Sequence, residues 1–145
     1  MKKILWVSEN SFHDRPWFDL LQENGYELDF ARNTDEAIKK IRAVKYEAIT
    51  TNVFVPTGIS ENEFEEAYKS GIGIKQFVNV TLKLVDLTRQ EPLNAHTPIF
   101  ILETDMPGFS DFQKEYVAKG ATAYFDKGNC LPSDFLSKVS RYLTD

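Results

Sequence analysis

The 145-residue sequence has a single cysteine, Cys130, and no apolar run longer than a few residues. One cysteine excludes an internal disulfide and a cysteine-cluster metal site, and we expect Cys130 to be a small apolar filler. No run is long enough to cross a bilayer, and the first apolar stretch ends by Ser8, too early for a secretion signal. We therefore expect a cytoplasmic protein without a membrane partner, in which the glycosylation sequon at 79–81 has no meaning.

Positive charge is also scarce. Lysine and arginine number 17 against 22 aspartates and glutamates, which gives a net charge of −5, and the basic residues are scattered. A nucleic-acid-binding protein usually carries a basic stripe, so the expected partners are proteins or small molecules. His13 and His96 lie far apart without ligand-spaced neighbours, so we expect no metal at either. The segment Gly71-Ile72-Gly73 lacks the Lys-Ser/Thr that completes a phosphate-binding loop.

Short apolar segments alternate with amphipathic ones along the whole chain. We expect strands at 3–7, 26–30, 46–51, 97–102 and 121–125. We expect helices at 14–24, 34–44, 61–69, 72–89, 110–119 and 132–143, with Thr34 and Ser110 as caps. The length fits one domain, residues 1–145. This order predicts an α/β fold, a parallel sheet covered by helices on both faces.

Polar residues follow four of the expected strands. In a doubly wound sheet, ligands bind beyond the carboxyl ends of the strands. The residues placed there are Ser8, Glu9, Asn10, Asn52, Val53, Glu103, Thr104, Asp105, Asp126, Lys127 and Gly128. The alternative is that they are loop residues that meet solvent.

Three segments resemble the receiver domains of bacterial response regulators. Residues 120–127, Gly-Ala-Thr-Ala-Tyr-Phe-Asp-Lys, resemble the family's fifth strand, with its Gly-Ala start, switch aromatic and lysine. Residues 4–10 resemble its first strand, and 46–56 resemble its third strand and the loop that ends in proline. The resemblance covers nearly the whole chain. It implies a flavodoxin-like sheet of strand order 2-1-3-4-5, with an insertion between strand 3 and helix 3.

The same resemblance implies where a phosphoacceptor pocket would lie. In the family, an aspartate after strand three attacks a phosphoryl donor, two acids after strand one help hold magnesium, and a Thr or Ser and a lysine hold the phosphoryl oxygens. The corresponding residues here are Asn52 for the acceptor, Ser8 and Glu9 for the acids, Glu103 beside Thr104 for the Thr or Ser, Lys127 for the lysine and Tyr124 for the switch aromatic.

Most of the family's chemistry is missing from these positions. The amide of Asn52 cannot form an acyl phosphate. Of the usual acids only Glu9 remains, so magnesium binding should be weak or absent, and we expect no other cofactor. Glu103 would repel a phosphoryl group. We interpret the chain as a degenerate pseudo-receiver: a non-enzymatic, phosphorylation-independent module of two-component signalling that contacts partner proteins near Tyr124 and residues 110–116, with homodimerisation left open.

Two hypotheses concern the residues that depart from the family. Lys127 is expected to pair permanently with Glu9 or Glu103, so that an acid occupies the place of the phosphoryl group and holds the domain in one state. The acidic insertion at 59–70 is expected to be a solvated surface helix. Its functional alternative is a lid over the strand ends or a docking surface.

Three alternatives to the pseudo-receiver interpretation remain. The chain could be a receiver phosphorylated at another residue, such as Thr51, Thr104 or Asp105, within a phosphorelay. It could be a flavodoxin-like domain that binds a small molecule. It could be a purely structural domain derived from a larger regulator.

Overall fold

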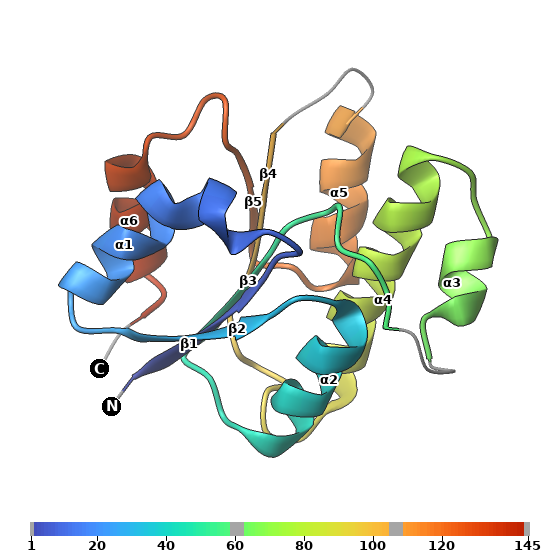
Figure 1. Ribbon diagram of the computed structural model, residues 1–145, viewed down its shortest axis with the longest axis horizontal. Coiled ribbons are helices and arrows are strands. Elements are labelled where there is room, and N and C mark those ends of the chain that lie inside the picture. The colour runs from blue at the N-terminus through green and yellow to red at the C-terminus, as the bar shows by residue number, and fades with distance from the viewer. Residues whose placement is uncertain (1, 59–62, 105–108, 144–145) are drawn as a thin grey trace.

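The computed structural model describes residues 2–58, 63–104 and 109–143, and their strands form one parallel sheet (Figure 1). The strands are β1 (Lys3–Val7), β2 (Glu27–Ala31), β3 (Ala48–Thr51), β4 (Ile99–Glu103) and β5 (Ala123–Asp126). Their order is β2-β1-β3-β4-β5, and every neighbouring pair is parallel. The strand order predicted from the resemblance is therefore confirmed, and each strand lies within two residues of its expected place.

Helices cover both faces of the sheet. They are η1 (Ser11–Asp14), α1 (Arg15–Glu23), α2 (Thr34–Ala43), α3 (Glu65–Lys69), α4 (Ile74–Gln90), α5 (Phe109–Lys119) and α6 (Pro132–Ser140). Alternation along β1 sends Ile4 and Trp6 into a core with α1 and α6, while Leu5 and Val7 enter the core of α2, α4 and α5. No helix among the described residues is long and apolar enough to cross a bilayer.

The starts of α1, α2 and α5 differ in detail from the sequence prediction. Asn33, not Thr34, caps α2, and its side-chain oxygen accepts a hydrogen bond from the N–H of Glu36 at 2.8 Å. Helix α5 begins at Phe109, so Ser110 lies inside it and is not its cap. Asp14 stands at the N-cap position of α1, but its side chain makes no capping hydrogen bond. Neighbouring residues with similar capping ability make such boundaries hard to place from sequence.

The insertion contains the short helix α3, which begins four residues later than expected and packs against α4. Phe64, just before it, is fully buried. The guanidinium of Arg42 in α2 forms salt bridges with Glu63 and with Glu91, both at 2.6 Å. The described part of the insertion is therefore anchored at its base, although α3 itself has no buried residue.

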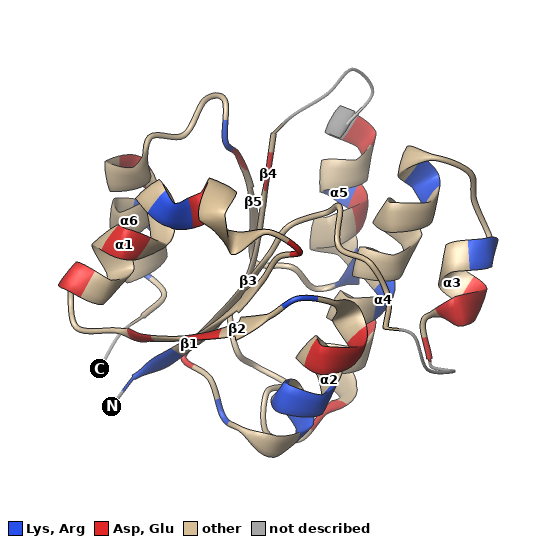
Figure 2. Ribbon diagram, viewed as in Figure 1, with Lys and Arg blue, Asp and Glu red and all other residues tan. Residues whose placement is uncertain are grey.

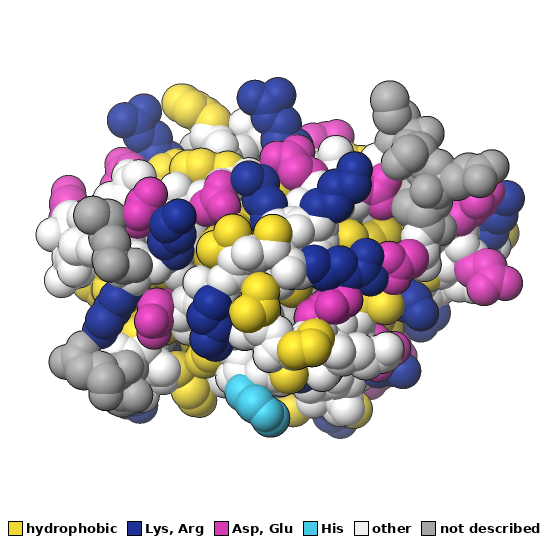
Figure 3. All heavy atoms as spheres, turned by 90° about the horizontal axis from the view of Figure 1, so that it is seen from below, with side chains coloured by type: hydrophobic (Ala, Val, Ile, Leu, Met, Phe, Trp, Pro, Cys, Tyr) yellow, Lys and Arg dark blue, Asp and Glu magenta, His cyan; other side chains and the backbone are white. Residues whose placement is uncertain are grey.

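Charges of both signs are distributed over the helices (Figure 2). On the face seen in Figure 3, basic side chains alternate with acidic ones and with small apolar groups. This face carries no continuous basic stripe of the kind that a nucleic-acid backbone requires.

Arg89, near the end of α4, joins the two segments that lead into β4 and β5. Its guanidinium donates hydrogen bonds to the carbonyl of Gly120 at 2.7 and 3.0 Å, and to those of Ala95 at 3.1 Å and Thr97 at 2.7 Å. The first carbonyl precedes β5 and the other two precede β4. A planar guanidinium can serve all three carbonyls together, which a lysine ammonium cannot.

We predict that Arg89→Lys lowers the free energy of unfolding by about 1.5–3 kcal/mol, because charge-assisted hydrogen bonds to at least one carbonyl are lost. Urea unfolding followed by circular dichroism measures the effect. The matched control is Arg15→Lys, since Arg15 is exposed and its guanidinium forms a surface pair with Asp19. Equal stability of the two variants would contradict the prediction.

Candidate functional site: a polar cavity at the carboxyl ends of the strands

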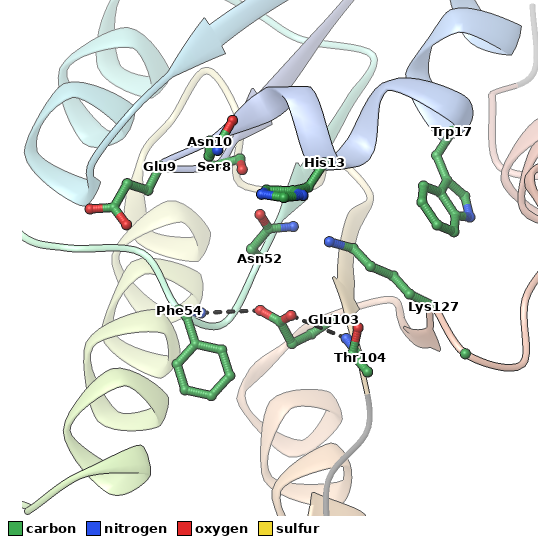
Figure 4. Close-up of a pocket in the computed structure, with 11 residues that line it drawn as sticks. Ser8, Glu9, Asn10, His13, Trp17, Asn52, Phe54, Glu103, Thr104 and Lys127 are labelled. Carbon is green, nitrogen blue, oxygen red and sulfur yellow. Dashed lines mark hydrogen bonds between the residues drawn. The ribbon is translucent and has the colours of Figure 1, made fainter.

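A cavity of about 560 Å³ lies at the carboxyl edge of the sheet (Figure 4). All six residues predicted for the pocket line it: Ser8, Glu9, Asn52, Glu103, Thr104 and Lys127. The others that line it are Asn10, His13, Trp17, Phe54 and Gly128. The parallel strands bring these residues together because their carboxyl ends share one edge.

The sequence prediction missed Asp14, and it also did not place His13, Trp17 or Phe54 at this edge. The side chain of Asp14 is fully buried beside the cavity and takes three donors. Its Oδ2 accepts hydrogen bonds from the indole N–H of Trp6 at 2.8 Å and from the amide of Asn52 at 2.9 Å, and its Oδ1 pairs with the ammonium of Lys127. A buried carboxylate is tolerated only with such partners. Asp14 therefore links β1 with the residues that follow β3 and β5.

The local sequence explains how Asp14 reaches this place. The side chain of Asn10 accepts a hydrogen bond from the N–H of Phe12 at 3.2 Å, which starts the turn of η1 and places Asp14 at the N-cap position of α1. Pro16, two residues later, has no N–H to offer a capping side chain. The carboxylate turns inward instead. In the sequence, the inward position of Asp14 is signalled only by the proline two residues later. The same pattern is the usual mark of a helix start, so it does not reveal the buried side chain.

Asn52 is held as a hydrogen-bond donor. Its Nδ2 donates to Asp14 and to the carbonyl of Leu102, each at 2.9 Å. Both partners are acceptors, so the amide orientation is fixed with the NH₂ group toward them. Asn52 is 8% exposed. A carboxylate in its place would set an anion against two acceptors.

Lys127 pairs with Asp14, not with Glu9 or Glu103 as expected. Its side chain is only 14% exposed, and its ammonium lies 5.9 Å from the ring centre of Trp17. The indole N–H of Trp17 donates to the carbonyl of Cys130 at 3.1 Å, which fixes the ring. The lysine is thus held between a buried carboxylate and an aromatic face.

Glu103, at the end of β4, points its carboxylate into a set of backbone N–H groups. Oε1 accepts hydrogen bonds from Val53 at 3.1 Å and Phe54 at 3.2 Å, and Oε2 accepts one from Thr104 at 3.1 Å. The residue is 9% exposed. The other acidic residue that lines the cavity, Glu9, is exposed.

Tyr124 does not line the cavity. Its ring packs on the core beside Tyr116, with ring centres 6.1 Å apart. Burial raises the pKa of the Tyr116 hydroxyl, which is fully enclosed. Cys130 is buried in the other core, and burial raises the pKa of its thiol. A protonated, enclosed thiol agrees with the predicted role of an apolar filler.

We predict that Lys127→Met destabilises the fold by about 3–5 kcal/mol, because it leaves the Asp14 carboxylate buried without its counter-ion. Thermal and urea unfolding measure the loss. The paired variant Lys127→Met/Asp14→Asn removes both charges and should recover part of it. A Lys127→Met variant as stable as the parent would show that the pair is not buried in solution.

We predict that Asn52→Asp is also destabilising, by about 3–5 kcal/mol at neutral pH, because two carboxylates then face each other. The double variant Asn52→Asp/Asp14→Asn restores one anion, one amide and Lys127. It should regain part of the stability, because the carboxylate at position 52 still faces the carbonyl of Leu102. Asn52→Ala, which only removes a donor, should lose less stability than Asn52→Asp. An equal loss in the two variants would contradict the repulsion.

The sequence matches no family model and no curated protein. Solved structures, in contrast, match over almost the whole chain. The chemotaxis response regulator CheY4 of Vibrio cholerae has a TM-score of 0.71 and 22% identity, covering 98% of each chain. A putative response regulator of Chloroflexus aurantiacus has a TM-score of 0.72 and 22% identity, covering 98% of this chain and 97% of that one.

A third similar structure is the receiver domain of the sensor histidine kinase PA1611 of Pseudomonas aeruginosa, solved with a magnesium ion in its active-site cleft. It has a TM-score of 0.68 and 15% identity, covering 98% of this chain and 97% of that one. At these identities the likeness concerns the fold. The chain has the flavodoxin-like fold of response-regulator receiver domains.

Proposed function

We propose that this chain is a degenerate receiver that acts as a regulatory protein-interaction module without phosphorylation at the end of β3. The observation that carries the proposal is the donor role of Asn52, whose amide sits between Asp14 and the carbonyl of Leu102. An amide is no nucleophile toward a phosphoryl donor. The lysine that would hold phosphoryl oxygens is paired with Asp14. The amide at Asn52 and the pairing of Lys127 both remove groups that phosphoryl transfer to this site would need.

The oxygen atoms available at the cavity also suit magnesium poorly as ligands. Both oxygens of Asp14 take N–H donors or the ammonium, and both oxygens of Glu103 take backbone N–H groups. Glu9 is the carboxylate that remains, among the described residues that line the cavity. Magnesium prefers several hard anionic oxygens in an octahedron. Weak or absent magnesium binding therefore belongs to the proposal.

The proposed partners are proteins of a signalling pathway. The net charge of −5 and the mixed charges of Figure 2 give no support to a nucleic-acid partner. The proposed contact surface lies on α5 and β5, near Tyr124, where Val117 is 53% exposed. A second copy of the chain is one possible partner.

The cavity favours one other function, the binding of a small molecule. Its volume of about 560 Å³ falls in the range of ligand pockets, and Trp17 and Phe54 supply apolar walls. Native mass spectrometry of the freshly purified protein tests this function. A stoichiometric copurifying compound that is lost on denaturation would favour it over the module proposed above.

We expect no mass increase when the protein is incubated with magnesium and acetyl phosphate, because no carboxylate stands free at the end of β3. Intact-mass spectrometry measures this, with an ordinary receiver as the positive control.

Thr51 is an unsuitable substitute acceptor, since it is fully buried and its hydroxyl donates to the carbonyl of Asn52 at 2.9 Å. Thr104 is exposed at the cavity, while Asp105 lies outside the described residues. A stable phosphoryl group mapped to any strand-end residue would overturn the proposal.

A further inference from the structure

Glu103 has a chemical environment unlike that of an ordinary surface glutamate. Three backbone N–H groups from two separate strand ends converge on its carboxylate, at 3.1, 3.2 and 3.1 Å. Two of them, Val53 and Phe54, follow β3, and the third, Thr104, follows β4. Figure 4 shows the bonds of Phe54 and Thr104 to the carboxylate. Converging backbone N–H groups form a site for an oxyanion. Here the chain supplies the anion itself.

We propose that Glu103 is a built-in ligand: its carboxylate permanently fills an oxyanion-binding site formed by the N–H groups of Val53, Phe54 and Thr104. This deepens the proposed function and rests on it, because a site filled from within leaves no room for a transferred phosphoryl group. The chemical class that the site takes is a small oxyanion, and a carboxylate matches it with two oxygens. The oxyanion site of this chain is therefore always filled, whereas the site of a switchable protein alternates between an empty and a filled state.

Burial and geometry support a permanent occupant over a passing contact. Glu103 is only 9% exposed, so these hydrogen bonds take the place of the water that solvates a surface carboxylate. The residue belongs to the central part of the sheet, because β4 pairs with both β3 and β5. Its backbone carbonyl also accepts the N–H of Lys127 at 3.1 Å. The anion is therefore placed by the sheet and not by a loose loop.

The filled site fixes more than its own atoms. The Phe54 N–H is one of the three donors, and its ring packs edge-on against Phe77 of α4, with ring centres 5.5 Å apart. The ring of Phe77 in turn packs edge-on against that of Tyr68 in α3, with ring centres 6.4 Å apart. A row of aromatic rings thus joins the anion site to the inserted helix. Without the Glu103 carboxylate, the loop after β3 loses two of its hydrogen bonds, those of the Val53 and Phe54 N–H groups. Helix α3 is the surface element that this row of rings reaches.

The test is chemical rescue of Glu103→Ala, which leaves an empty space lined by three N–H donors. The expected result is a lower Tm and amide hydrogen exchange at Val53, Phe54 and Thr104 that is faster by about tenfold or more. Sodium formate should restore both in a saturable manner, whereas sodium chloride at equal ionic strength should not. The parent protein should not respond to formate.

Glu9→Ala is the matched control, because Glu9 lines the same cavity and its removal changes the charge equally, but its side chain is exposed. It should change neither Tm nor amide exchange, and formate should have no effect on it. The proposal is overturned if Glu103→Ala has the same Tm and amide exchange as Glu9→Ala. It is also overturned if formate has no effect on Glu103→Ala.

Glu103→Gln keeps the test decisive if Glu103→Ala does not fold. A glutamine offers one accepting oxygen and one NH₂ group, so it can satisfy only one side of the site. Exchange should therefore speed up at either Thr104 or the pair Val53 and Phe54, and unchanged protection of all three would refute the built-in ligand. These readouts are independent of the acetyl phosphate experiment. Phosphoryl uptake by the parent protein would overturn the proposed function, whereas a failed rescue without uptake would overturn only the role of Glu103.

Discussion

A carboxylate enclosed at Asp14 requires three donors, and meeting that requirement organises the whole edge of the sheet. Trp6 comes from β1, Asn52 from the end of β3 and Lys127 from the end of β5. Burying an unpaired charge is far more costly than any surface contact is stabilising, so the three partners are fixed together. The cavity, the orientation of the Asn52 amide and the position of the lysine all depend on this one buried anion.

The two acids at the edge divide the available donors between them. Asp14 takes the side-chain donors, and Glu103 takes the backbone donors. As a result, the strong donors near the end of β3 already have internal acceptors. The chain has the fold of receiver domains. Under the function proposed above, these donors serve internal acidic side chains in place of a phosphoryl group.

Much of the frame could be predicted from the sequence. Runs such as 4–7 and 99–102 are apolar enough to indicate buried parallel strands, and the sheet's topology then places Asn52, Glu103 and Lys127 at one edge. The pairing of Lys127 could not be predicted. Asp14 precedes Pro16 and so has the sequence pattern of a helix cap, and nothing in the residues' order shows its side chain turning inward.

The role of Glu103 was hidden for a different reason. Its charge is visible in the sequence, and that charge alone suggests repulsion of an incoming anion. The three groups that bind it belong to the backbone, which every residue has, so no residue type marks them. The cap of α2 was missed at Asn33 because Thr34 beside it is nearly as good a capping residue. Backbone geometry decided both cases.

The position of the tryptophans gives the edge of the sheet an optical property. The chain has two tryptophans. The indole N–H of Trp6 donates to Asp14, and the ring of Trp17 faces the ammonium of Lys127. Indole emission depends on hydrogen bonding at the ring nitrogen and on charges near the ring. The tryptophan fluorescence of this protein therefore originates beside the buried ion pair, and it reports a rearrangement there without an attached label.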